Sequence, residues 1–379
     1  MIVEKQEVTT PRRERLEDTL VVDVDVHVHE LPGEIAKYCD MPWRKSLEVI
    51  AGIPERYLDL PGFSPGASTL CPPFPGGHQG ARMVFSAAQM RAELSAISVD
   101  IGILFPDHLL KMAVIPQTDY AAALARAYNA WLIDKWCSLE QRLLGCLVAA
   151  PQDPEGAARE IERYAKEPAI VGVYLPTAGV DPLWGNRKYD PIFQAAQDAD
   201  LPVLFHSVTV IHPVFPCELH QFDTELARHA LAHPFSMMAN MVSLITTGVP
   251  VRFPKLRIAF TEAGVSWVPF IMNRLDKEYT ERRREVPFLT QRPSHYIKQM
   301  YFATQPVEEP ENPLDLVTIL SLYGGEETTM FASDWPHHDF DHPRQVFQLP
   351  FSPEARRKVM GENALRFFKI DAEGRRLDL

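Results

Sequence analysis

Histidine and carboxylate side chains follow four separate apolar, β-branched segments of this chain. The segments are VVDVDVHVH (21–29), PVLFH (202–206), KLRIAFTE (255–262) and TMFASDWPHH (329–338). Imidazole nitrogens and carboxylate oxygens are ligands of first-row divalent metals. A barrel of parallel strands brings side chains at its strand ends together at one rim. The spacing therefore predicts a metal site assembled from strand ends.

The first segment carries four polar residues at alternate positions, Asp23, Asp25, His27 and His29. Alternate residues of a strand point to the same face. We therefore expect His27 and His29 to converge as metal ligands. Asp25 is expected to be a further ligand or an outer partner that orients an imidazole.

The later segments supply one candidate each, or two. His206 is expected to be a ligand, and Glu262 a ligand or, alternatively, the ion-pair partner of a basic residue. Asp334 can bind metal and accept a proton from metal-bound water. After Pro336 turns the chain, His337 or His338 can reach back to the site, and the sequence analysis favours His338.

The number of candidates favours more than one ion. One open site cannot use all six of the main candidates, which are His27, His29, His206, Glu262, Asp334 and His338. Two divalent ions with bridging carboxylates can. The mixed ligands favour Fe or Mn, with Zn as an alternative. In a second interpretation one ion is bound, and Glu262 and His338 join Asp334 as catalytic acid and base groups.

Eight short apolar strands alternating with helices are expected to position these residues. They are predicted at 19–28, 100–105, 143–149, 170–174, 202–205, 256–261, within 296–303, and at 329–332. This alternation predicts an α/β fold, a (β/α)8 TIM barrel. An open doubly wound sheet would need a glycine-rich turn after its first strand, where this chain has HVHELPG. The helical pattern of 219–247 is expected to break near Pro234.

The barrel is expected to form a single domain over residues 19–379, preceded by an N-terminal arm at 1–18. Residues 31–90 are rich in proline and glycine and are predicted to form an irregular, lid-like insertion over the barrel mouth, without regular helix.

Composition excludes several classes of function. The 379-residue chain has a net charge of −12 and no long basic stretch, so nucleic acid is not an expected partner. No apolar run approaches the roughly 20 residues of a membrane span. Five scattered cysteines without a CxxC pair predict reduced thiols and a cytoplasmic protein. The expected partner is a small-molecule substrate. The chain could form homo- or hetero-oligomers, but its sequence does not indicate an oligomeric state.

Several segments together resemble a known family. They are VDVDVHVH, RLLGCLVAAPQDPE, AIVGVYLP, LPVLFH, RFPKLRIAFTEAGVSWVP, MFASDWPH and GENALRFF, spread over residues 19–370. The chain resembles the amidohydrolase-related metal-dependent enzymes, in the branch that includes aminocarboxymuconate-semialdehyde decarboxylase and γ-resorcylate decarboxylase. The resemblance implies a TIM barrel whose metal is bound by His27, His29, His206 and Asp334.

The sixth strand departs from that branch. Its decarboxylases carry a histidine in an H-x-G context, where this chain has Glu262 in TEAG. The glutamate makes the chain similar to a subgroup of dinuclear Fe or Fe/Mn oxygenases that includes isobutylamine N-hydroxylase. The favoured expectation is therefore an oxygenase that hydroxylates a small organic substrate with O2. The alternatives are a hydrolase or non-oxidative decarboxylase that uses metal-activated water, and a non-catalytic partner subunit.

Overall fold

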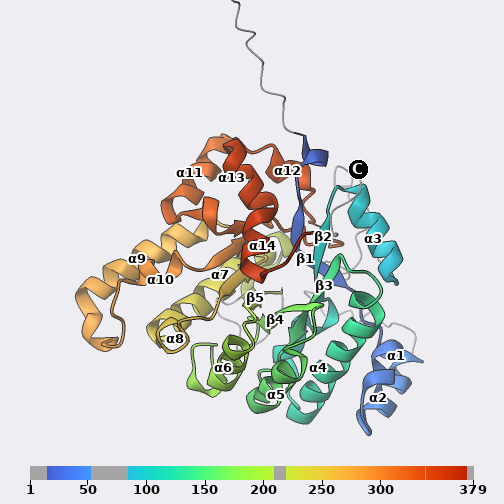
Figure 1. Ribbon diagram of the computed structural model, residues 1–379. Coiled ribbons are helices and arrows are strands. Elements are labelled where there is room, and N and C mark those ends of the chain that lie inside the picture. The colour runs from blue at the N-terminus through green and yellow to red at the C-terminus, as the bar shows by residue number, and fades with distance from the viewer. Residues whose placement is uncertain (1–14, 53–83, 209–218, 338, 374–379) are drawn as a thin grey trace, which may run out of the picture.

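The computed structural model describes residues 15–52, 84–208, 219–337 and 339–373. Its strands form one eight-stranded parallel sheet in the order of the sequence, from β1 to β8 (Figure 1). The strands are β1 (Val22–Val28), β2 (Ile101–Pro106), β3 (Leu143–Val148), β4 (Ile170–Pro176), β5 (Val203–His206), β6 (Ile258–Thr261), β7 (Tyr301–Ala303) and β8 (Thr329–Met330). Each lies at or within a predicted segment, give or take two residues.

Backbone hydrogen bonds between β1 and the chain around β8 bring the two ends of the sheet together. The amide of Val24 donates to the carbonyl of Phe331 (3.0 Å), and the amide of His27 donates to the carbonyl of Trp335 (2.8 Å). In the other direction, the amide of Asp334 donates to the carbonyl of Asp25 (3.0 Å). The predicted (β/α)8 TIM barrel is thereby confirmed.

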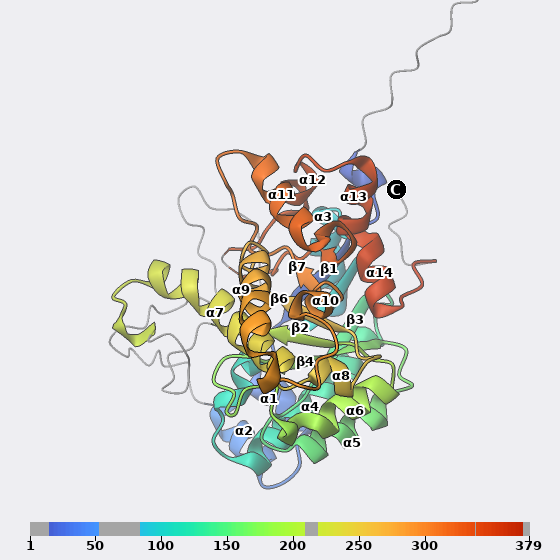
Figure 2. The ribbon, with the colours of Figure 1, turned by 90° about the vertical axis from the view of Figure 1, so that its left-hand side faces the viewer.

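The helices lie outside the strands, with α11 to α13 on one side and α4 to α6 on the opposite side in both views (Figures 1 and 2). Nearly every strand residue is buried, because the apolar strands face the barrel interior on one side and helices on the other. The helices are α1 (Pro32–Ile35), α2 (Trp43–Ala51), α3 (Ala87–Ala96), α4 (Thr118–Leu132), α5 (Pro154–Tyr164), α6 (Asp190–Asp198), α7 (Glu225–Thr246), α8 (Val249–Arg252), α9 (Trp267–Arg282), α10 (Pro293–Ile297), α11 (Pro313–Tyr323), α12 (Pro343–Phe347), α13 (Pro353–Arg357) and α14 (Asn363–Phe368).

Three helices differ from the sequence-based expectation. Helix α7 continues through Pro234, although proline removes a backbone donor. Buried Met237, Met241 and Leu244 on the following turns pack into the core and hold the helix against that cost. Helices α1 and α2 lie inside the insertion that was expected to lack regular helix. Proline is tolerated at the first position of α1, and the nine residues of α2 fall between prolines.

The other predictions about domain organisation concern residues that are described only in part. Residues 53–83 of the predicted lid and residues 1–14 of the predicted arm lie outside the described part of the chain. Among the described helices, none combines the length and apolar character that crossing a membrane requires.

Candidate metal centre

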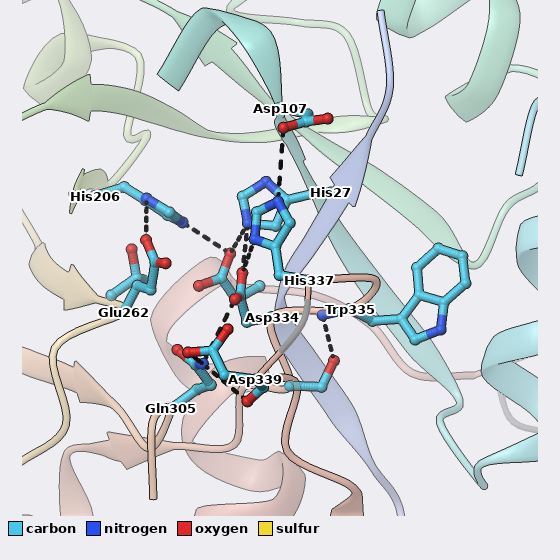
Figure 3. Close-up of polar contacts among 12 residues, drawn as sticks. His27, Asp107, His206, Glu262, Gln305, Asp334, Trp335, His337 and Asp339 are labelled. Carbon is cyan, nitrogen blue, oxygen red and sulfur yellow. Dashed lines mark hydrogen bonds and ion pairs between the residues drawn. The ribbon is translucent and has the colours of Figure 1, made fainter. Parts of the chain in front are cut away.

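Four buried side chains from opposite parts of the barrel converge at the carboxyl end of the strands. Asp25 and His27 come from β1, His206 ends β5, and Asp334 follows β8. One ligand atom from each lies within 4.8 Å of the others. His27 Nε2 is 2.9 Å from Asp334 Oδ1 (Figure 3). Asp25 Oδ1 is 3.2 Å from His27 Nε2 and 3.1 Å from His206 Nε2. We call these four residues the inner cluster.

The two imidazoles of the inner cluster are oriented by backbone carbonyls. His27 Nδ1 lies 2.6 Å from the carbonyl oxygen of Pro106, and His206 Nδ1 lies 2.7 Å from that of Ser207. A carbonyl only accepts, so each Nδ1 carries a proton, and a neutral ring would present the lone pair of Nε2. Those lone pairs face carboxylate oxygens, and both kinds of atom are hydrogen-bond acceptors. A cation between the nitrogens and the oxygens would satisfy both, so the residues present fit a divalent metal.

The electrostatics of the inner cluster favour positive charge. Burial alone would lower the pKa of His27, but the carboxylates of Asp25 and Asp334 outweigh it and raise that pKa well above its usual value. Burial would raise the pKa of Asp334, yet His337 and His27 hold it well below the usual range. The carboxylates therefore stay ionised and attract a cation.

Glu262 lies at the edge of the inner cluster, directly after β6. Its Oε2 is 3.2 Å from His206 Nδ1 (Figure 3). Burial first, and then the charges of Asp334 and Asp25, raise the pKa of Glu262 well above its usual value. The backbone of Glu262 (φ 56°) and that of Asp334 (φ 61°) are both left-handed. Such residues cost about 1–3 kcal/mol each and concentrate at functional sites.

His29 departs from the expectation that it would join His27. Its Nδ1 lies 2.6 Å from Asp107 Oδ2, and its ring packs on His108 with centroids 4.4 Å apart. The physical reason is that β1 ends at Val28, so strand alternation no longer directs the side chain of His29 into the barrel. Asp25, which was expected to be a ligand or an outer partner, lies in the inner cluster, and His29 does not.

His337 is a site residue that the sequence analysis passed over in favour of His338, which lies outside the described residues. His337 Nδ1 is 2.7 Å from Asp334 Oδ1, and its ring stacks on that of His27 at 4.2 Å (Figure 3). Burial would lower the pKa of His337, but Asp334 outweighs it and raises the pKa to about 9.

Asp107 was also missed, although its position carried the same signal as the other strand ends. It directly follows the apolar strand β2, and its two oxygens face different histidines: Oδ2 contacts His29, and Oδ1 lies 3.6 Å from His337 Nε2. Glu30 accepts hydrogen bonds from the amides of Asp107 (3.0 Å) and Leu109 (2.6 Å), which fixes this loop against the end of β1.

Comparison with known proteins identifies decarboxylases among the relatives. The chain is 26% identical over 285 residues to a gamma-resorcylate decarboxylase of Rhodococcus jostii (strain RHA1), across 68% of this chain and 80% of that protein. It is 25% identical to the gamma-resorcylate decarboxylase of Polaromonas sp. (strain JS666), across 68% of this chain and 79% of that protein.

Solved structures share the fold. The 5-carboxyvanillate decarboxylase of Sphingomonas paucimobilis superposes with a TM-score of 0.68 at 20% identity, covering 93% of this chain and 100% of that one. A dihydroxybenzoic acid decarboxylase of Polaromonas sp., solved with manganese and the inhibitor 2-nitroresorcinol, gives a TM-score of 0.68 at 18% identity over 93% and 97% of the two chains.

The oxygenase prediction is contradicted by these relatives, which are decarboxylases and support that alternative instead. The error came from two observations that were taken to favour O2 chemistry: Glu262 in TEAG in place of the usual histidine, and the number of candidate ligands. His29 lies outside the inner cluster, and additional ligands do not by themselves imply oxidation. The family that the sequence resembles is confirmed: a sequence model of the amidohydrolases matches residues 24–370, and the chain belongs to the amidohydrolase family.

Proposed function

We propose that this protein is a metal-dependent decarboxylase that removes CO2 from an aromatic carboxylic acid without consuming O2. The observation that carries the proposal is the convergence of Asp25, His27, His206 and Asp334 at the carboxyl end of the barrel strands. The gamma-resorcylate decarboxylases among the relatives supply the reaction and the substrate class.

The inner cluster would hold one divalent ion. Mn²⁺ is the first candidate, because mixed carboxylate and imidazole ligands suit it and a decarboxylase of the same fold was solved with manganese. When bound, such an ion supplies a Lewis acid for the oxygen atoms of an aromatic acid. The carbonyls of Pro106 and Ser207 hold His27 and His206 in the tautomer that ligation requires.

His337, held by Asp334, would supply the proton that this reaction consumes. When the bond between the ring carbon and the carboxylate breaks, CO2 leaves, the electron pair stays on the ring carbon, and that carbon takes up a proton. His337 is hydrogen-bonded to Asp334 at 2.7 Å and lies within the metal centre, so it can hold a proton beside the substrate. Asp107, at 3.6 Å from the far nitrogen, helps to orient the ring.

Aromatic rings line the cluster on the barrel side. The ring of Phe105 lies 5.3 Å from that of His206, and the ring of Tyr174 lies 5.9 Å from it. The Tyr174 hydroxyl donates to the carbonyl of Leu110 at 3.0 Å, away from the cluster. These rings limit access of water from the barrel side, which strengthens electrostatic interactions with a bound acid.

The thiols support a reducing compartment. Cys39, Cys137 and Cys146 are buried and form no disulfide among the described residues. We therefore also propose that the protein is cytoplasmic.

Metal-dependent CO2 release tests the proposed reaction. Purified protein is stripped with a chelator, reloaded with MnCl2, and incubated with 2,6-dihydroxybenzoate and a panel of other hydroxybenzoates. Loss of acid is followed by chromatography together with CO2 release, in air and under anaerobic conditions. We expect Mn-dependent turnover at equal rates in both. Turnover that requires O2, or no turnover of any acid by fully loaded protein, would contradict the proposal.

A further inference from the structure

We propose that Glu262, His233 and His229 form a second divalent-metal site beside the inner cluster. This inference rests on the proposed function, because Glu262 lies between the two sites. One ligand atom from each of the three residues lies within 4.8 Å of the others. Two imidazoles and a carboxylate are a donor set suited to Mn, Fe, Co or Zn.

Helix α7 supplies the two histidines on one face. His229 and His233 are four residues apart, so they lie one turn apart on the same side of the helix. Their ring centroids are 4.7 Å apart. Two histidines at this spacing on a helix can ligate one metal ion. The continuity of α7 through Pro234 therefore matters, because the predicted break would have disturbed the turn that carries His233.

Glu262 lies between the histidines of α7 and His206 of the inner cluster. Its Oε1 is 3.4 Å from His233 Nδ1, and its Oε2 is 3.2 Å from His206 Nδ1. The side chain is buried, and Oε2 has no hydrogen bond of good geometry. A buried carboxylate oxygen without such a bond is costly unless another group compensates it. Ligand atoms of Glu262, Asp334 and His337 also lie within 4.8 Å of one another, so the two sites are contiguous.

A carboxylate and an amide extend this arrangement. Asp339 Oδ2 lies 3.6 Å from His229 Nε2. Gln305 Nε2 is within 3.3 Å of Asp339 Oδ2 and 3.5 Å of Asp334 Oδ2, and so connects a carboxylate of each site (Figure 3). Outer-shell amides of this kind orient ligating carboxylates. The strained backbone of Glu262 (φ 56°) fits a residue held in place for binding.

The competing explanation is that Glu262 only forms an ion pair with His233. The 3.4 Å separation of His233 Nδ1 and Glu262 Oε1 is within ion-pair distance, but it joins only one histidine to the carboxylate. A second ion pair, between His229 Nε2 and Asp339 Oδ2 at 3.6 Å, would account for the other two groups in the same way. A cation shared by Glu262, His233 and His229 explains why one ligand atom from each lies within 4.8 Å of the others, and the two explanations predict different numbers of bound ions.

Metal stoichiometry and spectroscopy of the full chain test the second site without an activity assay. Chelator-stripped protein is reloaded with excess MnCl2 and desalted, and Mn per chain is measured by mass spectrometry together with the Mn²⁺ electron paramagnetic resonance spectrum. We expect two Mn per chain and a spin-coupled signal from the wild type. His233→Asn is expected to bind one Mn per chain, with the spectrum of an isolated ion. If that variant fails to fold, the half-buried His229→Asn makes the same test.

Two further variants separate failure of this site from failure of the proposed function. His295 is an exposed histidine of α10 whose ring contacts Gln299. The His295→Asn variant should therefore retain two Mn. His27→Asn should lose the ion of the inner cluster. One Mn in the wild type, unchanged by His233→Asn but lost in His27→Asn, would overturn the second site and leave the inner cluster standing. Full Mn content in His27→Asn would instead overturn the inner cluster.

Discussion

Four polar residues alternate in the sequence at the first strand, and the two inner ones, Asp25 and His27, differ sharply from the two outer ones, Asp23 and His29. Asp25 and His27 lie in the middle of the set and face His206 and Asp334 across the barrel. Asp23, deeper in the barrel, accepts hydrogen bonds from the amide (2.9 Å) and hydroxyl (2.5 Å) of Ser333. His29, beyond the strand end, contacts Asp107.

This difference shows that residue type and spacing select candidates, whereas the groups opposite each side chain decide its role. The polar atoms of Asp23 already meet donors from Ser333, so that residue can be satisfied without a metal. His27 Nε2 meets only carboxylate oxygens, so it needs a cation or a proton. The predictions below test this distinction along β1 and at its nearest partners.

The largest effect is expected from His27→Asn. Outer partners of metal ligands contribute roughly 10–100-fold to affinity or activity, so loss of a ligand should lower kcat/KM at least about 100-fold. Metal content of the inner cluster should fall in parallel. Both are measured on protein reloaded with MnCl2, with His295→Asn as a folded control. Retention of metal together with activity would show that His27 is not a ligand.

The next effect is expected from His337→Asn, and it should separate catalysis from metal binding. If His337 carries the proton, kcat should fall by about 100-fold while metal content stays at the wild-type level. Steady-state kinetics and metal analysis on the same samples make the comparison. A parallel loss of metal and activity would mean that His337 acts as a ligand or as a support for Asp334.

The sequence predicted the barrel and much of the candidate centre because both depend on local patterns. Apolar strands repeat along the chain, and polar side chains at their ends must meet at one rim. His27, His206, Asp334 and Glu262 follow from that pattern, and Asp107 would have followed had it been applied to β2.

Other parts of the site depend on contacts that are remote in sequence. Whether His29 enters the barrel depends on the residue at which β1 ends and on the hydrogen bond between its ring and Asp107. The contact of α7 with Glu262 through His233 depends on tertiary packing, so the sequence alone gives His229 and His233 as ordinary helix residues. His337 and His338 are adjacent, and the turn after Asp334 brings His337 to the cluster, with its Nδ1 2.7 Å from Asp334 Oδ1.

A smaller effect on activity is expected from His29→Asn. The variant loses the contact with Asp107, whose other oxygen faces His337 Nε2 at 3.6 Å. His29 therefore acts on the site only through a second residue, and kcat/KM should fall less than about 10-fold, with full metal content. A loss as large as that of His27→Asn would show that His29 reaches the metal when substrate or metal is bound.

The smallest effect on activity is expected from Asp23→Asn, which should instead change stability in a pH-dependent way. Burial raises the pKa of Asp23 from 3.8 to about 7, against the hydrogen bonds from Ser333. The folded protein thus holds this proton more tightly than the unfolded chain, so the contribution of Asp23 to stability declines as pH rises from about 4 to 7.

Asparagine has no proton to lose and keeps an acceptor for the Ser333 amide. The Tm of the variant minus that of the wild type should therefore increase across this pH window, by about 1–4 °C. Calorimetry of both chelator-treated proteins at several pH values measures the difference. A constant difference, or loss of Mn binding by the variant after reloading with MnCl2, would place Asp23 with Asp25 and His27 in function and remove the distinction between the inner and outer residues.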